Sequence, residues 1–204
     1  MEESLKTLLE DGLRQIDSSF CTPSILSRLE KYYDQVTLFN SALGLVNADG
    51  KELVTRHILD SVIPLPCMRS LISRDFNGPV SIADLGSGNG MPGLVLSCIA
   101  TETEPSWKFH LVERMGRRAG FLRNTLAVTG LADRTEVVQS DMNDIKNTFD
   151  VLIMRAFRPF EAIGDRLLEL CHEGSLVFIW TAGAPNGVTV LRKSAAGVFQ
   201  KVQL

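Results

Sequence analysis

A glycine-rich turn stands between an apolar run and a helix-forming segment in the first half of the chain. The apolar run Val80–Asp84 ends in an acid. The glycines of the turn are Gly86, Gly88, Gly90 and Gly93. Glycine allows positive φ angles and lets a ligand approach the main chain, and the first amides of a helix bind anions. This pattern predicts a strand, a ligand-binding loop and a helix in direct succession.

Strand patterns and helix patterns alternate from this point onward. The predicted strands are Val80–Asp84, Lys108–Val112, Thr135–Val138, Val151–Met154 and Leu176–Trp180. The predicted helices between them are Gly93–Ala100, Arg114–Thr129 and Phe160–Cys171. Alternating strands and helices form right-handed βαβ units with a parallel sheet, and ligands bind beyond the carboxyl ends of its strands. We therefore expect a Rossmann-like α/β fold with the glycine turn at its ligand-binding edge.

Residues 1–78 predict helices only, and we expect them to form a cap on a core of residues 79–204. Apolar residues recur at helical spacing over residues 5–16 and 25–43. A third helix is predicted from about Leu53, and two prolines downstream should kink or end it.

The composition is that of a globular protein. Of 204 residues, 45% are hydrophobic and 22% are charged, which is too hydrophobic for a disordered chain. Basic residues number 21 and acidic residues 24, giving a net charge of −3. This balance excludes a generally basic nucleic-acid-binding surface but leaves a local basic patch open.

Cysteine usage and the chain start favour a cytoplasmic protein. The four cysteines are Cys21, Cys67, Cys98 and Cys171. They form no CxxC pair, which argues against a zinc site and a disulfide framework. The acidic start Met1-Glu2-Glu3 lacks the basic residues of a signal peptide, and no apolar run is long enough to span a bilayer. We expect a monomer without metal or membrane segment.

The identity of the ligand depends on the glycine spacing. The last three glycines match the GxGxxG pattern of dinucleotide sites, but another glycine precedes them and Asp84 ends the strand. An acid there suits a ligand with an ammonium group and a carboxylate, which favours S-adenosylmethionine. A nicotinamide dinucleotide and a turn without a ligand are the alternatives. Glu113, at the next strand end, can accept the ribose hydroxyls of either cofactor. The cofactor contacts expected from this pattern are Asp84, Ser87, Gly88, Gly90 and Glu113.

Four segments of the sequence occur together in one known family. They are Arg56–Ser61 (RHILDS), Gly86–Gly93 (GSGNGMPG), Glu113–Arg123 (ERMGRRAGFLR) and Met154–Phe157 (MRAF). In this order they resemble the small-subunit ribosomal RNA guanine-N7 methyltransferases, the RsmG/GidB family, first called glucose-inhibited division protein B. The resemblance implies a class I S-adenosylmethionine-dependent methyltransferase fold with an N-terminal helical extension. It also implies guanine in 16S ribosomal RNA, free or in the small ribosomal subunit, as substrate.

The resemblance also implies particular cofactor contacts. The family's contacts fall on Gly86, Met91, Met142, Asn143 and Arg155. Arg155 is the candidate catalytic residue, expected to position the guanine through O6 or to contact the methionine carboxylate; a surface arginine is the alternative. Guanine N7 has a free lone pair and no proton at neutral pH, so methyl transfer to it needs no general base.

Candidate RNA contacts lie in three of these segments. They are His57, Arg114, Arg117, Arg118, Arg123 and Phe157. The arginines bring positive charge to the start of one helix, which either faces RNA phosphates or is simply solvated. His57 contacts RNA or packs within the cap. Phe157 stacks on the target base or packs in the core.

The sequence departs from the family near its end. The fifth strand ends in Thr181-Ala182-Gly183 where the family has Lys-Gly, and only a short segment follows. We therefore expect the closing strands to be incomplete. Three other functions stay open: methyl transfer to a small molecule or protein, nicotinamide-dependent oxidoreduction, and cofactor binding without catalysis.

Overall fold

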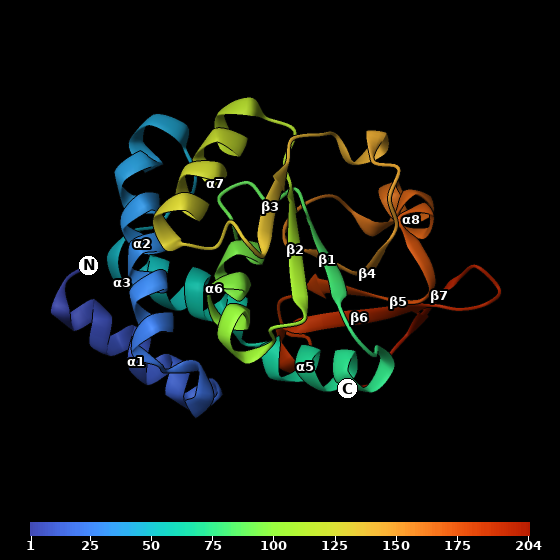
Figure 1. The fold of residues 1–204 in the computed structure, drawn as a ribbon, viewed down its shortest axis with the longest axis horizontal. Helices are drawn as coiled ribbons and strands as arrows, with labels where there is room; N and C mark the ends of the chain where they lie inside the picture. Colours follow the sequence, from blue (N-terminus) through green and yellow to red (C-terminus); the bar gives the residue numbers. More distant parts are fainter.

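A seven-stranded sheet forms the centre of the molecule (Figure 1). The computed structural model describes residues 1–204 apart from the side chain of Pro185. The strands are β1 (Val80–Leu85), β2 (Trp107–Val112), β3 (Thr135–Val138), β4 (Phe149–Met154), β5 (Cys171–Trp180), β6 (Val188–Lys193) and β7 (Phe199–Lys201). Their order is β3-β2-β1-β4-β5-β6-β7, and β1 to β5 pair in parallel. The expected α/β arrangement is confirmed.

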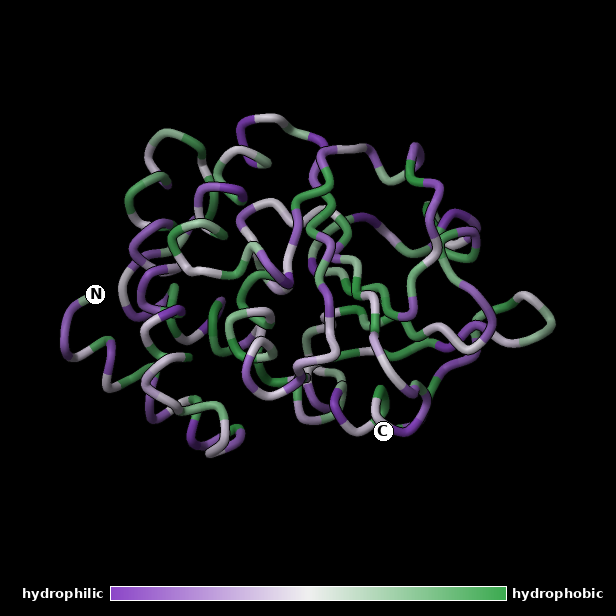
Figure 2. The backbone as a smooth tube through the Cα atoms, in the orientation of Figure 1, coloured by the Kyte–Doolittle hydropathy of each residue, from purple (hydrophilic) through white to green (hydrophobic). Residues whose placement is uncertain are grey.

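Helices cover both faces of the sheet. Helices α6 (Gly93–Thr103) and α7 (Gly116–Thr129) pack on one face, and α8 (Phe160–Glu169) packs on the other. Along β1, Ile82 joins the cluster that contains α6 and α7, whereas Ala83 joins the cluster of α8. Figure 2 shows hydrophobic segments concentrated along the central strands. This packing fixes the strands, so that their carboxyl ends meet at one edge.

The C-terminal region corrects the sequence prediction. Strand β6 pairs antiparallel with β5, with Val188 opposite Trp180, and β7 pairs antiparallel with β6. The expectation of incomplete closing strands is therefore wrong. Val188 and Val190 are buried and alternate with more exposed neighbours, so this segment returns as a hairpin strand on β5 and requires no helical crossover.

The N-terminal helices form a cap against the face covered by α6 and α7. They are α1 (Glu3–Ile16), η1 (Ser18–Phe20), α2 (Pro23–Leu43), α3 (Gly50–Glu52), η2 (Leu53–Leu59), α4 (Asp60–Val62) and α5 (Leu65–Asp75). Cap and core share one hydrophobic cluster, which contains Leu29 of α2 and Ile82 of β1. The division between residues 78 and 79 stays a prediction. Two short turns, η3 (Met142–Asp144) and η4 (Pro185–Gly187), lie in loops of the core.

The third predicted helix contains an irregular segment. Element η2 is a π-helix that continues into α4, and α5 begins only after Pro64. The break at Pro64 confirms the expected effect of the prolines. π-Helical turns are frequent at functional sites, and the end of this one faces the carboxyl ends of β4 and β5.

The described residues also bear on membrane, metal and thiol chemistry. Among them, no helix combines the length and the apolar character that a bilayer span requires. No group of three or more His, Cys, Asp or Glu side chains in this part of the chain is placed to hold a metal ion. The four cysteines are free, and burial raises the pKa of Cys98 and Cys171 to about 12, which keeps both thiols protonated.

Candidate active site

The glycine loop after β1 is held by its own hydrogen bonds. Gly86 and Ser87 both donate their amides to the Val112 carbonyl, at 2.9 and 3.0 Å. Gly86, Gly88 and Gly90 have φ angles of +73°, +51° and +92°, a region that favours glycine. The loop is therefore anchored to the end of β2 in a conformation that the glycines make possible.

Asp84 lies beneath the loop. Its side chain is buried, and Oδ2 accepts a hydrogen bond from the Gly93 amide at 3.0 Å. A Cβ on Gly93 would lie 2.6 Å from that oxygen, so glycine is required there. Asp84 thus holds the start of α6 against the end of β1. A direct contact between Asp84 and the cofactor stays a prediction.

Burial raises the pKa of Asp84 to about 7, so the stability of the protein should depend on pH. From about pH 4 to about pH 7, the carboxyl ionises in the unfolded chain but keeps its proton in the folded protein. The stability that Asp84 contributes is therefore complete in acid and lost as the pH rises through about 7. The loss amounts to up to ~4 kcal/mol in the free energy of unfolding.

Denaturant unfolding of the wild type and of Asp84→Asn at about pH 5 and pH 8 measures this effect. The asparagine amide does not ionise, so the variant should gain stability relative to the wild type as the pH rises. The same pH dependence in both proteins would show that Asp84 is already ionised in the folded state.

Glu113 closes the other side of the glycine loop. It is 5% exposed, and its carboxylate accepts the amides of Gly88 at 3.0 Å and Met115 at 2.7 Å. Each carboxylate oxygen has a second acceptor position. The side chain can therefore still receive two hydroxyl groups, which supports its predicted role as the ribose acceptor.

A cavity of about 220 Å³ lies over the ends of β1, β2 and β3. Its walls include six of the predicted site residues: Gly86, Glu113, Arg114, Arg118, Met142 and Phe157. Small-molecule sites usually measure about 300–1,000 Å³. A Cβ on Gly86 would lie 2.2 Å from the Phe157 ring, so this ring fills the space above the loop. The room for a larger ligand therefore depends on the position of Phe157.

The other predicted cofactor contacts lie around this cavity without lining it. They are Asp84, Ser87, Gly88, Gly90, Met91, Asn143 and Arg155. Met91 is buried and donates its amide to Asn89 Oδ1 at 3.1 Å. Asn143 donates its amide to Asp141 Oδ1 at 3.0 Å, within the η3 turn. Their contacts with a cofactor stay predictions.

Arg155 extends from the end of β4 to the cap. Its guanidinium donates to the carbonyls of Arg56 and His57, at 2.9 and 3.1 Å, and to Ser61 Oγ at 3.1 Å. It also pairs with Asp60 at 2.9 Å. Arg155 therefore connects the loop after β4 to the end of the π-helix. Burial, together with the nearby Arg155, lowers the pKa of His57 and favours its neutral imidazole.

The cap also holds the glycine loop, through two contacts that the sequence analysis missed. The Tyr32 hydroxyl donates to the Asn89 carbonyl at 2.9 Å, and Asn89 Nδ2 donates to the Leu45 carbonyl at 3.1 Å. Asn89 lies inside the glycine motif, and this position could have identified it as a site residue. Tyr32 is indistinguishable in sequence from the other apolar residues of its helical stripe.

The loop after β4 contains a strained residue. Ala156 has a φ of +47°, which is uncommon for a residue with a side chain. Phe157 follows it and lies against Gly86, and the Arg158 guanidinium sits 5.3 Å from the centroid of the Phe157 ring. The strain is maintained because Arg155 and Phe157 are both held, one by the cap and one by the glycine loop.

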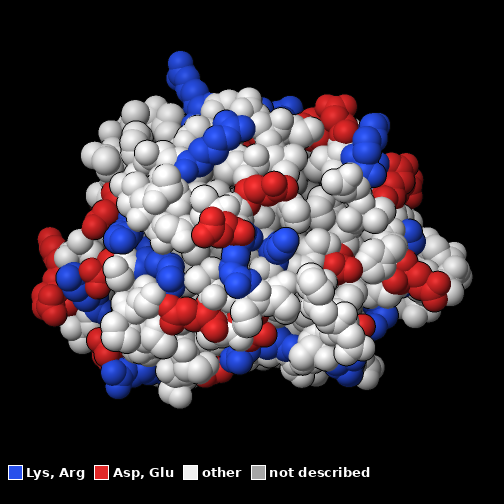
Figure 3. Space-filling model, in the orientation of Figure 1, with Lys and Arg blue, Asp and Glu red and all other residues white. Residues whose placement is uncertain are grey.

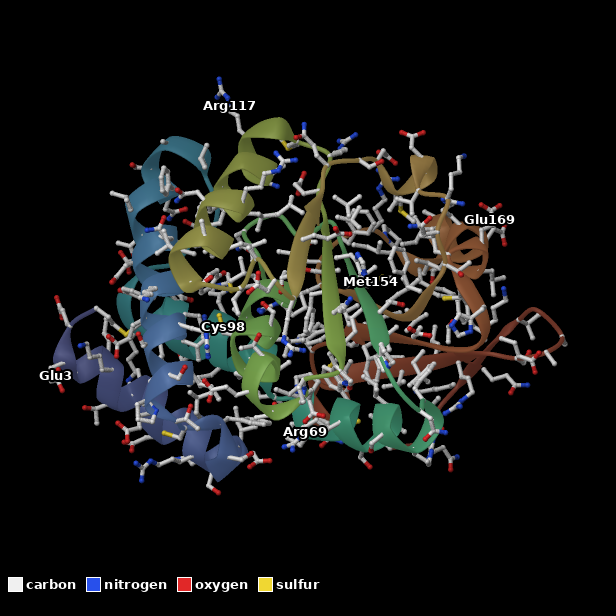
Figure 4. All side chains as sticks on the ribbon, in the orientation of Figure 1. Glu3, Arg69, Cys98, Arg117, Met154 and Glu169 are labelled. Carbon is white, nitrogen blue, oxygen red and sulfur yellow. The ribbon has the colours of Figure 1, made fainter. Side chains whose placement is uncertain are left out.

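Basic side chains surround the mouth of the cavity. Arg114 and Arg158 lie 3.9 and 3.8 Å from the Asp141 carboxylate, and Arg118 lines the wall. Arg123 donates to Gln139 Oε1 at 3.1 Å. Arg117 projects into solvent from the start of α7 (Figure 4), where Figure 3 also shows basic groups. The sequence analysis did not include Arg158 among the candidate RNA contacts. Its position directly after the MRAF segment could have identified it.

The comparison with known families decides between the alternatives. Residues 25–195 match the family described as GidB, rRNA small subunit methyltransferase G. The chain belongs to this family. It is an S-adenosylmethionine-dependent methyltransferase, as the resemblance implied. Membership in the methyltransferase G family thus rules out the nicotinamide-dependent oxidoreductase and the glycine turn without a ligand.

Individual relatives support this assignment over most of the chain. Ribosomal RNA small subunit methyltransferase G of Nitrosomonas europaea is 33% identical over 205 aligned positions, gaps included, and the alignment covers 98% of this chain and 89% of the relative. The Borrelia turicatae protein of the same name is 30% identical over 197 residues, 96% of this chain and 89% of the relative. A structure described as a Plasmodium falciparum protein-L-isoaspartate O-methyltransferase, in complex with S-adenosyl-L-homocysteine, has a TM-score of 0.56. The two sequences are 13% identical, and the superposition covers 98% of this chain and 93% of the Plasmodium chain. This similarity shows the class I methyltransferase fold.

Proposed function

We propose that this protein transfers the methyl group of S-adenosylmethionine to N7 of a guanine in 16S ribosomal RNA. The observation that carries the proposal is the cavity where the glycine loop faces the Glu113 carboxylate. Gly86 would allow close approach to the main chain where the Phe157 ring now lies, Glu113 would accept the ribose hydroxyls, and Met142 would pack on the adenine. Family membership supports ribosomal RNA as the substrate class.

The residues of the site act by placement. When bound, S-adenosylmethionine supplies an electrophilic methyl group that the N7 lone pair attacks while the electrons of the S–C bond stay on sulfur. N7 carries no proton, so the chain does not have to provide a base. Orientation of two reactants in one site is worth up to ~7–11 kcal/mol of the barrier. The cap serves this purpose by holding both loops, one through Asn89 and one through Arg155.

Arg155 fits the role of a positioning residue in this scheme. Its hydrogen bonds all go to the cap, and it directs the backbone that carries Phe157. Contact of Arg155 with guanine O6 or with the methionine carboxylate would require these bonds to be exchanged. His57, whose carbonyl receives one of them, would contact RNA from the neighbouring surface of the cap.

The basic residues around the cavity mouth are the proposed phosphate contacts. Replacing either Arg114 or Arg117 by alanine should weaken RNA binding and reduce its salt dependence. Each lost phosphate contact lowers the slope of log K against log salt by about 0.7–0.9. Filter binding to 16S ribosomal RNA between about 50 and 200 mM salt measures the slope.

The matched control is Arg74→Ala. Arg74 is exposed at the end of α5. Because α5 leads into the start of β1, Arg74 lies at the opposite edge of the sheet from the glycine loop, which follows the end of β1. Its removal changes the net charge by one unit without changing the proposed RNA surface. If Arg74→Ala lowered the slope as much as the loss of Arg114 or Arg117, the arginines near the cavity would not be specific RNA contacts.

The proposal also covers partners and compartment. The substrate is 16S ribosomal RNA or the small ribosomal subunit, encountered by a monomer in the cytoplasm. Mass mapping of modified guanines in 16S ribosomal RNA, from cells with and without the gene, tests the proposed function. One N7-methylguanine should disappear with the gene and return with its expression. Identical maps would refute the assigned substrate.

A further inference from the structure

A second cavity, of about 400 Å³, lies beside the first, beyond the ends of β4 and β5. Ala156, Phe157 and Arg158 line both cavities. The strand ends contribute Met154 and Trp180 to the second one. The loop after β4 is therefore a partition between a cofactor cavity and a neighbouring cavity with aromatic walls.

Trp180 is fixed in this second cavity by the cap. It is the last residue of β5 and is half-buried, and its Nε1 donates to the Asp60 carbonyl at 3.2 Å. The same cap segment receives the guanidinium of Arg155. The other aromatic wall, Phe157, is already in contact with Gly86 and the Arg158 guanidinium. Trp180 is thus the aromatic side chain best placed to receive a flat ligand.

We propose that the second cavity is the acceptor pocket and that the target guanine stacks on Trp180. The proposal rests on the proposed function, because it takes the methyl acceptor to be a guanine. Unpaired bases of RNA are commonly recognised by stacking on aromatic side chains. The shared partition places a base in this cavity next to a cofactor in the first one.

Trp180 also matches the change in charge during the reaction. The N7 lone pair forms the new N–C bond, the S–C electron pair stays on sulfur, and no proton leaves. The neutral guanine therefore becomes a cation. A tryptophan face attracts a cation more strongly than a neutral ring. Trp180 consequently binds the transition state more tightly than the substrate, which is the requirement for a faster chemical step.

Fluorescence tests the pocket without relying on activity. The chain has two tryptophans, and Trp107 is buried at the start of β2, so Trp107→Phe leaves Trp180 as the single emitter. This variant is titrated with 7-methylguanosine monophosphate, guanosine monophosphate and adenosine monophosphate in the presence of S-adenosylhomocysteine. The concentration that quenches half of the emission should be about fivefold or more lower for 7-methylguanosine monophosphate than for guanosine monophosphate. Absence of quenching, or equal quenching by all three, would overturn the proposal.

Kinetics provide the second readout. Trp180→Ala should lower kcat for 16S ribosomal RNA by about tenfold and leave KM for S-adenosylmethionine within about twofold. Trp180→Phe should recover most of kcat, since it restores an aromatic face. Trp107→Phe is the matched control and should keep wild-type kinetics. An unchanged kcat in Trp180→Ala would contradict the proposal.

The two claims fail in different ways. If the wild type modifies no ribosomal RNA but Trp180 distinguishes 7-methylguanosine from guanosine, the pocket stands and the assigned RNA substrate fails. If the wild type methylates 16S ribosomal RNA and Trp180 responds to no guanine nucleotide, the function stands and the pocket is wrong.

Discussion

Replacing Gly86 with alanine should lower the affinity for S-adenosylmethionine by about 100-fold or more. The φ of +73° at Gly86 costs a residue with a side chain about 1–3 kcal/mol. The added Cβ would also lie 2.2 Å from the Phe157 ring, so the ring or the loop must move. Both line the cavity that we propose as the cofactor site. Calorimetric titration with S-adenosylhomocysteine measures the loss.

Gly88→Ala is the matched control for this experiment. Gly88 has a similar positive φ of +51°, but the nearest atoms to its Cβ would be the Gly86 carbonyl oxygen at 3.6 Å and the Arg118 guanidinium at 3.8 Å. Only the backbone strain remains, so its affinity should fall by clearly less than that of Gly86→Ala. If Gly86→Ala bound the cofactor as the wild type does, the loop would not be the cofactor site.

Replacing Arg155 with alanine should destabilise the folded protein by about 2–4 kcal/mol and lower kcat by at least about tenfold. The side chain is 20% exposed, and its loss removes the hydrogen bonds to the carbonyls of Arg56 and His57 and leaves the Asp60 carboxylate without its guanidinium partner. The loop carrying Phe157 also loses its connection to the cap. Urea unfolding gives the stability, and steady-state kinetics give kcat and KM.

Two further variants define what Arg155 does. Arg155→Lys keeps the charge but lacks the planar fork that contacts several acceptors, so it should restore only part of the stability. Arg158→Ala removes a neighbouring, more exposed arginine and should change stability by less than about 0.5 kcal/mol. Wild-type stability in Arg155→Ala, combined with lost cofactor binding, would instead mean that Arg155 contacts the cofactor directly.

The sequence predicted those features that depend on short-range patterns. The alternation of strand and helix placed β1 to β5 and the glycine loop, because burial of one face imposes a period on each element. The position of Glu113 beside the glycine loop was also predictable, because the carboxyl ends of adjacent parallel strands meet at one edge. Its contact with the ribose stays a prediction. The hairpin strand β6 was not predicted, because the departure from the family after the fifth strand was weighted above the local alternation at Val188 and Val190.

The features that could not be predicted depend on contacts between distant parts of the chain. Arg155 meets Asp60 and its neighbours only because the cap folds back over the ends of β4 and β5. Tyr32 reaches Asn89 in the same way. The hydrogen bond from the Gly93 amide to Asp84 is a contact of this kind as well, whereas the contact of Asp84 with a cofactor stays a prediction. No periodicity along the chain carries this information.

Methyl transfer in vitro tests the central claim most directly. Purified protein, S-adenosylmethionine labelled in its methyl group, and 16S ribosomal RNA or small subunits from cells lacking the gene are incubated and the RNA is digested to nucleosides. The label should appear in 7-methylguanosine alone, and Gly86→Ala should abolish it. Label in a different nucleoside, or none in ribosomal RNA while the protein still binds S-adenosylhomocysteine, would contradict the assignment.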